Sequence, residues 1–261
     1  RCDLLEVEPN NTLEEIETIP MEQWLCGGFG ATDSPLGDID FLTFTPSTSS
    51  WLEVSMEAAN RGSSADAQFT LFDDDNSLTV LDGYLTTDPR VVIPAPAHAY
   101  SLALGETSYS SGDAYNWAIL ASEVKQPVEW TGRETEGNDS FGAANEFALG
   151  ATVFGTIERA GDFDWYHVLT PEDADTIVFT VEANSSGSPL DSTLILYEND
   201  GTSIVHTDTV GEVDYDRDPW FEQKQTGAND WYLLVKNVST GGSDYHWYTL
   251  TITAEYDPDS G

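Results

Sequence analysis

The sequence predicts an all-β protein built from two tandem, jelly-roll-like antiparallel β-sandwiches. Three observations support this prediction: short β-rich segments recur, polar turn clusters separate them, and one acidic pattern occurs twice, 128 residues apart. The chain has 261 residues, enough for two domains of about 130 residues each. We expect a first domain at 1–126 and a second at 127–261. Pro and Gly interrupt the strand pattern at about 125–133, which we take as the linker.

Each half contains short segments in which apolar and β-branched side chains alternate or run together, as strands do. The expected strands include 41–44, 51–56, 68–72, 90–93 and 100–104 in the first half, and 165–168, 176–181, 193–197, 231–235 and 248–252 in the second. The clusters 73–76 and 198–201 are expected to form hairpin turns. Only 12–19 and 140–148 have a pattern that fits a helical turn.

Landmarks of the two halves also match beyond the acidic pattern. Leu71-Phe72-Asp73 aligns with Leu196-Tyr197-Glu198, and Tyr115-Asn116-Trp117 aligns with Tyr245-His246-Trp247. The repeat therefore extends over the full length of both halves. Trp130 in the expected linker is predicted to pack either between the domains or on the surface of one of them.

The composition is strongly acidic. The chain has 9 Lys and Arg against 47 Asp and Glu, a formal net charge of −38. Such a charge repels nucleic acid and anionic membranes, and it favours cations, high salt or cationic partners. Adaptation to salt is the simpler alternative, although it does not predict two matching clusters. No run of 18 apolar residues occurs, so we expect no membrane span.

The two cysteines, Cys2 and Cys26, both lie in the first half. A disulfide that ties down the N-terminal segment is the simplest interpretation, and a pair of unrelated free thiols is the alternative. Together with few lysines and many Asp, Thr, Ser and Gly residues, the cysteines favour an oxidising compartment. The chain starts at Arg1, so we expect a mature or trimmed form without its export signal.

The repeated acidic pattern is rich in oxygen side chains. Its first part is Glu-x-Glu-x-Asn-Asx, and about 30 residues later a Gly-Asp-x-Asp-aromatic run follows. The oxygen-bearing residues are Glu6, Glu8, Asn10, Asn11, Asp38 and Asp40, and Glu134, Glu136, Asn138, Asp139, Asp162 and Asp164. In an extended chain alternate residues share one face, so the two glutamates and the asparagine of each copy would lie together.

Neighbouring carboxylates repel each other unless a cation lies between them. Calcium takes 6–8 oxygen ligands, whereas magnesium suits a crowded all-protein cage less well and zinc lacks its usual His and Cys ligands here. A solvated acidic strand edge is the alternative for either cluster by itself. Recurrence of the whole set favours a calcium site in each half.

These motifs resemble the bacterial pre-peptidase C-terminal domain, a family that includes the collagen-binding domains of clostridial collagenases. The resemblance rests on the acidic patterns, on the phrase Leu190-Asp191-Ser192-Thr193, on the aromatic strand 231–235 and on a Tyr-rich closing strand. It implies a jelly-roll-like sandwich, often attached to secreted peptidases, whose N-terminal acidic segment is ordered by calcium in the collagen-binding members.

The resemblance also implies a ligand set in each half. The carried-over residues are Glu6, Glu8, Asn10, Asn11 and Asp40, and Glu134, Glu136, Asn138, Asp139 and Asp164. Asp38 and Asp162 are added from the residues themselves, since the aspartate spacing differs from that of the collagen-binding members. The first half has Ala65-Asp66-Ala67-Gln68 where the second has Leu-Asp-Ser-Thr, so the second half matches the family better.

No local catalytic motif is present. The histidines are scattered, and there is no His-Glu-x-x-His, Gly-x-Ser-x-Gly or phosphate-binding loop. We therefore expect a noncatalytic bacterial module, secreted or on the cell surface, that binds calcium and an extracellular protein or polysaccharide for adhesion or targeting. Alternatives are a polysaccharide-binding module and a hydrolase fragment with an acid pair such as Asp214 and Asp216. A sugar platform would draw on Trp220, Phe221, Trp231, Tyr245, Trp247 and Tyr248.

Overall fold

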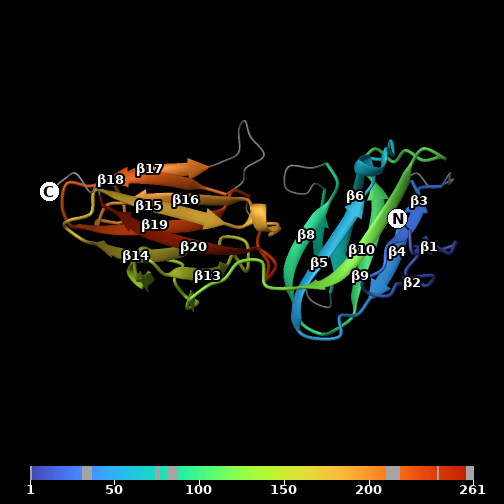
Figure 1. Cartoon of the computed structure of the whole chain (residues 1–261), viewed down its shortest axis with the longest axis horizontal. Helices are drawn as coiled ribbons and strands as arrows, with labels where there is room; N and C mark the ends of the chain where they lie inside the picture. Colours follow the sequence, from blue (N-terminus) through green and yellow to red (C-terminus); the bar gives the residue numbers. More distant parts are fainter. Residues whose placement is uncertain are drawn as a thin grey trace. The chain divides into compact units, whose positions relative to one another are not determined.

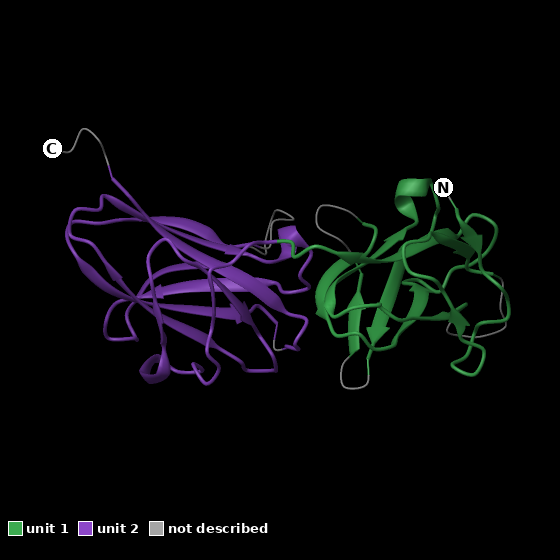
Figure 2. Ribbon diagram, turned by 60° about the horizontal axis from the view of Figure 1, so that its bottom comes forward, with its two compact units in different colours: residues 1–127 green, residues 128–261 purple. Residues whose placement is uncertain are grey.

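The structure is a computed structural model, and it describes residues 2–30, 37–73, 77–81, 87–209, 218–239 and 241–256. The chain divides into two compact units, residues 1–127 and 128–261, each described here by itself (Figure 2). The division falls inside the expected linker region. No helix among the described residues combines the length and apolar character that a membrane crossing requires.

Unit 1 contains ten strands in its described residues (Figure 1). They are β1 (Leu4–Leu5), β2 (Glu17–Thr18), β3 (Leu25–Gly28), β4 (Asp40–Phe44), β5 (Ser50–Glu57), β6 (Ala67–Phe72), β7 (Ser77–Val80), β8 (Arg90–Ala95), β9 (Tyr100–Glu106) and β10 (Asn116–Val124). They form two sheets with the orders β1-β3-β10-β5-β8 and β2-β4-β9-β6-β7. A short 3₁₀ helix, η1, spans Ala59–Arg61.

Unit 2 repeats this architecture. Its described strands are β11 (Gly132–Arg133), β12 (Asn145–Phe147), β13 (Thr152–Thr156), β14 (Asp164–Thr170), β15 (Thr176–Glu182), β16 (Ser192–Tyr197), β17 (Ile204–Thr209), β18 (Trp220–Lys224), β19 (Asn229–Asn237) and β20 (Trp247–Glu255). The sheet orders are β11-β13-β20-β15-β18 and β12-β14-β19-β16-β17. The 3₁₀ helices η2 (Phe141–Ala143) and η3 (Asn184–Ser186) complete the unit.

The strands form where apolar residues alternate with polar ones. In β5, Leu52, Val54 and Met56 are buried and the intervening residues are partly exposed. In β15, Ile177 and Phe179 point into the core in the same way. Burying each such side chain stabilises a unit by roughly 1.5–3 kcal/mol. The predicted fold class, two tandem β-sandwiches, is confirmed.

The sheets are antiparallel except at one edge of each. There, β1 pairs with β3, β2 with β4, β11 with β13, and β12 with β14, all in parallel. The reason is that the first segment of each unit adds a short strand to the edge of one sheet and then another to the edge of the second. Residues 6–11 and 134–139 lie between these edge strands, so each acidic segment crosses from one sheet to the other.

Local expectations fare differently. The segment 12–19 contains a turn in which the Glu15 amide donates to the Thr12 carbonyl (3.0 Å), and 140–148 contains η2. The turn at 198–201 joins β16 to β17, with Gly201 at φ 64°. In the turn predicted at 73–76, residues 74–76 lie outside the described residues. Trp130 stacks on Phe154 within unit 2, with ring centroids 4.5 Å apart.

Candidate metal centre

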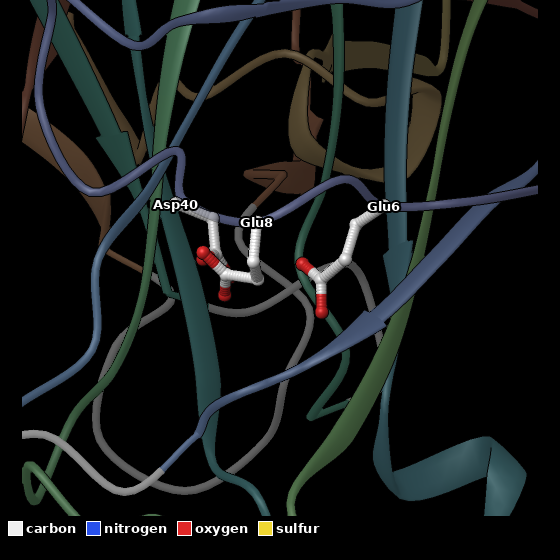
Figure 3. A group of neighbouring side chains, drawn as sticks. All are labelled: Glu6, Glu8 and Asp40. Atoms are coloured by element: carbon white, nitrogen blue, oxygen red, sulfur yellow. The ribbon is translucent and has the colours of Figure 1, made fainter.

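The acidic side chains of unit 1 converge between its two sheets. Glu6, Glu8 and Asp40 each offer one carboxylate oxygen, and these oxygens all lie within 4.8 Å of one another. Figure 3 shows the three carboxyl groups facing a common space. Glu6 directly follows β1 and Asp40 begins β4, so one ligand candidate comes from the edge of each sheet. Within the part of the chain that the structure describes, no other group of three acidic, His or Cys side chains meets this spacing.

Each carboxylate of this cluster is held by a neighbouring donor. The Gly28 amide donates to Glu6 Oε1 (2.8 Å), and the indole of Trp117 donates to Asp40 Oδ2 (3.0 Å). The Asn10 amide donates to Glu8 Oε2 (3.1 Å). These bonds orient the acids and leave other oxygens available. Glu6 Oε2 is buried without a hydrogen-bond partner.

Asn10, Asn11 and Asp38 lie around this cluster. Asn10 is fully buried, and its side-chain amide can face the acids with either end. With nitrogen inward it donates to Asp40 Oδ1 (3.0 Å) and Glu8 Oε2 (3.1 Å), and with oxygen inward it adds a further oxygen. Asn11 is exposed and donates to Glu8 Oε2 (3.2 Å). Asp38 is buried and accepts from the Gly30 amide (2.5 Å).

Burial and mutual repulsion raise the pKa values in this cluster. Burial raises the pKa of Asp40 to about 9, and the charges of Glu6 and Asp38 add to the effect. Burial likewise raises the pKa of Glu6 to about 7, with Glu8 contributing. Full ionisation of these acids is therefore unfavourable without a compensating positive charge.

Unit 2 holds its acids in a different network. The Thr156 amide donates to Glu134 Oε1 (2.5 Å), and the hydroxyls of Tyr166 and Tyr248 donate to Glu134 Oε2 (3.1 and 3.2 Å). Tyr248 also lies 2.7 Å from Asp164 Oδ2 and 2.7 Å from the Tyr166 hydroxyl. In unit 1, Leu42 and Trp117 take the places of the two tyrosines. Two buried hydroxyls thus support the acids of unit 2.

Several buried polar atoms of this second cluster have no hydrogen-bond partner. Both amide atoms of Asn138 are in this state, as are Oδ1 of Asp139, Asp162 and Asp164. Asn138 and Asp164 are fully buried. Buried polar atoms are normally paired, so this group fits a cation that oxygen ligands surround.

The remaining members differ in exposure and charge. Burial raises the pKa of Asp164 to about 10 and that of Asp162 to about 6. Glu136 is exposed, yet partial burial and the charge of Glu134 raise its pKa to about 7. Asp139 accepts an ion pair from Arg159 (2.9 Å). The sequence matches the family better in the second half, whereas the carboxylates lie closer together in the first.

Sequence reasoning missed several residues that shape these sites. Trp117 pairs with Gly27 and Tyr248 pairs with Gly155, so Trp117 corresponds to Tyr248. The alignment of Trp117 with Trp247 is therefore wrong by one residue. Any side chain at Gly27 or Gly155 would overlap the ring opposite it, which explains both glycines. The strand register was the signal, and it is visible only in the structure.

A second repeated feature caps the 3₁₀ helices. Asp88 accepts from the amides of Ala58, Ala59 and Asn60, at 2.8–3.0 Å. Asp218 accepts in the same way from the amides of 183–185 (2.7–3.0 Å). The dipeptides at 88–89 and 218–219, both Asp-Pro, were the available sequence signal. These aspartates hold the turn after β5 and β15 and lie outside the acidic clusters.

The candidates for other functions are placed as follows. Phe221, Trp231, Tyr245, Trp247 and Tyr248 are buried, and of the predicted sugar platform only Trp220 is exposed, at 53%. That set therefore belongs mainly to the core. The pair Asp214 and Asp216 lies outside the described residues.

The histidines lie apart from one another. His246 lies 2.8 Å from the Ser243 hydroxyl inside one tight turn, and His167 lies between Glu146 and Asp230. His98 stacks on Tyr100 and His206 packs against Phe221.

Comparisons with known proteins give only weak likenesses. No protein-family model and no curated protein matches the chain. Similar solved structures include the pre-peptidase C-terminal domain of a Bacillus anthracis collagenase, with 15% identity and a TM-score of 0.34 over 43% of this chain and 99% of that one. Tandem CBM51 modules of a family 98 glycoside hydrolase from Streptococcus pneumoniae have 7% identity and a TM-score of 0.26, covering 91% and 85%.

The secreted serine protease VesC from Vibrio cholerae is similar at 12% identity and a TM-score of 0.27. The match covers 84% of this chain but only 48% of the protease structure, so this chain spans about half of that length. At such identities and TM-scores these likenesses concern the fold alone. They bear on neither activity nor ligand.

Proposed function

We propose that this chain is a noncatalytic tandem module that binds calcium in each unit. The observation that carries the proposal is the convergence of Glu6, Glu8 and Asp40 oxygens within 4.8 Å, in a donor pattern that recurs 128 residues later. A hard cation with oxygen ligands suits this donor set. The candidate ligands in the two units are Glu6, Glu8, Asn10, Asn11, Asp38 and Asp40, and Glu134, Glu136, Asn138, Asp139, Asp162 and Asp164.

The unpartnered buried oxygens support the same proposal. Glu6 Oε2 in unit 1 and Asp164 Oδ1 in unit 2 are buried without donors, and burial raises the pKa values of both residues. When bound, calcium would supply the positive charge that lets these acids ionise together. The protein's own contribution is to orient them through Gly28, Trp117, Thr156 and Tyr248.

The consequence would be mechanical. Each acidic segment crosses from the edge of one sheet to the edge of the other, and its edge strands are only two or three residues long. Strands of this length contribute few backbone hydrogen bonds. Binding at the crossing would therefore fix the segment against its sandwich and make the unit more rigid.

We further propose that the module acts outside the cytoplasm, as part of a secreted or cell-surface protein such as a peptidase. The Cys2–Cys26 disulfide supports this, because disulfides persist mainly in oxidising compartments. Its target would be an extracellular protein or polysaccharide, bound for adhesion or substrate targeting. The strong negative charge disfavours nucleic acid as a partner.

Calorimetric melting tests the calcium proposal. Ligand binding to the folded state stabilises it by RT ln(1 + [L]/Kd), about 2.7 kcal/mol at a hundredfold excess over Kd. We expect calcium to raise the melting temperature relative to EGTA, and magnesium at the same concentration to raise it less. The Glu8→Gln variant, altered at an exposed ligand candidate, should lose part of the calcium effect. Identical melting in calcium and EGTA would contradict the proposal.

A further inference from the structure

We propose that the Cys2–Cys26 disulfide and the Trp130–Phe154 ring pair are equivalent clasps that position the first carboxylate of each acidic cluster. The first clasp is covalent and reducible, whereas the second is aromatic. Reduction would therefore weaken calcium binding in unit 1 and leave unit 2 unchanged. This inference rests on the proposed function and adds its regulation.

Strand register establishes the equivalence. In unit 1, β1 pairs with β3 so that Leu5 lies opposite Cys26. In unit 2, β11 pairs with β13 so that Arg133 lies opposite Phe154. Both residues of each pair are shifted by 128, and the same shift places Trp130 at the position of Cys2. A disulfide in one unit and two stacked rings in the other thus join the same two backbone positions.

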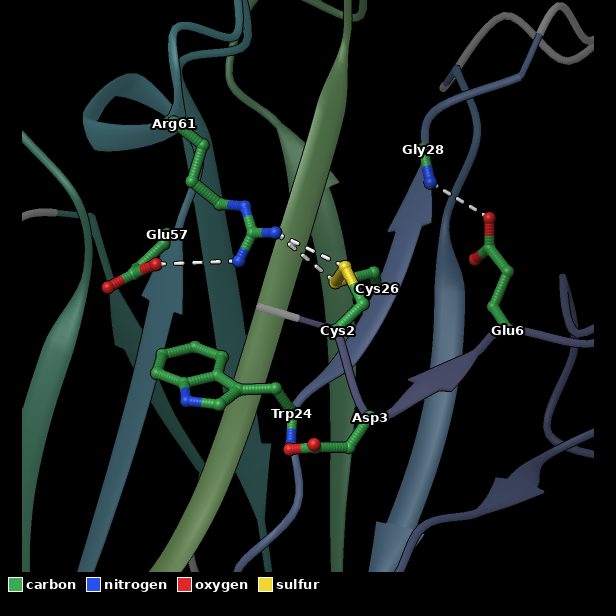
Figure 4. The surroundings of a disulfide bond; sticks show 8 residues. All are labelled: Cys2, Asp3, Glu6, Trp24, Cys26, Gly28, Glu57 and Arg61. Carbon is green, nitrogen blue, oxygen red and sulfur yellow. Dashed lines mark hydrogen bonds and ion pairs between the residues drawn. A yellow bond between two sulfur atoms is a disulfide. The ribbon is translucent and has the colours of Figure 1, made fainter.

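Each clasp lies directly beside the carboxylate that it would position. The Glu6 amide donates to the carbonyl of Cys26 (2.9 Å), and Gly28 then donates to Glu6 Oε1 (2.8 Å), as Figure 4 shows for the second bond. In unit 2 the Glu134 amide donates to the carbonyl of Phe154 (2.9 Å). One member of each clasp therefore also holds the backbone of the first ligand candidate.

Few other contacts hold the segment in unit 1. Strand β1 has two residues, and both are exposed. Before it, the Asp3 amide donates to the Trp24 carbonyl (2.9 Å), and the Trp24 amide donates to Asp3 Oδ2 (3.2 Å) at the surface. In unit 2 the guanidinium of Arg133 adds a cation–π contact, 4.5 Å above Phe154 and 5.3 Å above Trp130. Opening the disulfide would thus free Glu6 more readily than any redox change could free Glu134.

The disulfide is open to attack. Cys2 is exposed, and a cavity of about 480 Å³ is lined by Cys2, Cys26, Glu6 and Arg61. The guanidinium of Arg61 lies 3.2 Å from the sulfur of Cys2 and 3.5 Å from that of Cys26 (Figure 4). A positive charge at this distance stabilises a cysteine thiolate as it leaves.

The reductant would be a dithiol. Its thiolate attacks one sulfur, the sulfur–sulfur bond breaks, and the displaced cysteine leaves as a thiolate. The second thiol of the reductant then displaces the other cysteine. The protein disulfide gains two electrons and the two protons of the dithiol, which is itself oxidised to a disulfide.

Calcium titration calorimetry on the full chain at 25 °C tests the inference. The protein is titrated oxidised and after reduction with dithiothreitol, and Glu8→Gln and Glu136→Gln assign the two binding events. We expect reduction to raise Kd about tenfold or more in unit 1, the range seen when groups that orient metal ligands are removed, and not in unit 2. Near-UV circular dichroism checks that both forms are folded. A merely structural disulfide would change the melting temperature but not Kd.

Exchange of the clasps provides the matched control. The double variant Cys2→Trp/Cys26→Phe should bind calcium in unit 1 with dithiothreitol-independent affinity, because rings replace the reducible bond. Trp130→Ala should weaken only the second event, with or without dithiothreitol. Equal affinities of oxidised and reduced wild type would overturn the clasp inference alone. No calcium binding by the oxidised protein would overturn the proposed function as well.

Discussion

Replacing Asp40 with Asn should stabilise the calcium-free protein and reduce its response to calcium. Asp40 is fully buried, and burial together with the nearby Glu6 raises its pKa from 3.8 to about 9. A carboxyl whose folded pKa lies above its unfolded value stabilises the fold below the unfolded value. That contribution is lost as the pH rises from about 3.8 towards 9.

The magnitude follows from that interval. Between the unfolded pKa of 3.8 and pH 7, each pH unit corresponds to 1.36 kcal/mol, which gives an upper limit of about 4 kcal/mol for the cost of Asp40 at pH 7. Asn is neutral and of similar size, and its oxygen can still accept the Trp117 indole proton. The variant therefore avoids most of this cost when calcium is removed.

Differential scanning calorimetry at pH 7, in EGTA and in calcium, provides the assay. We expect Asp40→Asn to melt several degrees above wild type in EGTA and to gain less from calcium. Asp113→Asn removes the same charge from an exposed position of unit 1 and should change neither value appreciably. Lower melting of Asp40→Asn in EGTA, or an unreduced calcium shift, would refute the reasoning.

Three further outcomes are expected in unit 2. Tyr248→Phe removes the hydroxyl that supports two carboxylates, so urea unfolding in calcium should show a loss of about 1–3 kcal/mol. Gly155→Ala places a methyl group against the ring of Tyr248 and should cost roughly 1–3 kcal/mol, measured the same way; an unchanged midpoint would contradict the packing. Burial lowers the pKa of His167, but hydrogen bonds from Glu146 and Asp230 raise it overall, so its stabilisation is full below pH 6.5 and lost as pH rises through the raised value. His167→Gln should accordingly destabilise the protein at pH 5.5 and much less at pH 9, as denaturant titrations would show.

Much of the fold was predictable because the strand signal is local. The expected strand 51–56 lies within β5, and 176–181 lies within β15, since alternation of apolar and polar residues directly reflects a half-buried sheet. The acidic segments were predictable for a similar reason. Their residues are contiguous in sequence, and their spacing of 128 survives unchanged in the structure.

The surroundings of the clusters were not predictable from the sequence. The partners of the acids come from β10 and β20, about 80 residues away from Asp40 and Asp164, and they are a Trp in one unit and a Tyr in the other. A chemical match could not align these two residues. Likewise, Cys26 and Phe154 share no chemistry, and only the pairing of short edge strands places them at the same position.

The parallel edge strands were also missed. Strands β1 and β11 have two residues each, too short for an alternation pattern to be recognised. They form because the preceding and following contacts, a disulfide or a ring pair and then the acidic crossing, bring the segment to the sheet edge.

The stoichiometry of calcium binding tests the central claim most directly. After treatment with a chelator and its removal, the oxidised full chain should bind two calcium ions in a calorimetric titration. Glu8→Gln and Glu136→Gln should each weaken one of the two binding events. A titration without binding heat, confirmed by equilibrium dialysis with no retained calcium, would contradict the account.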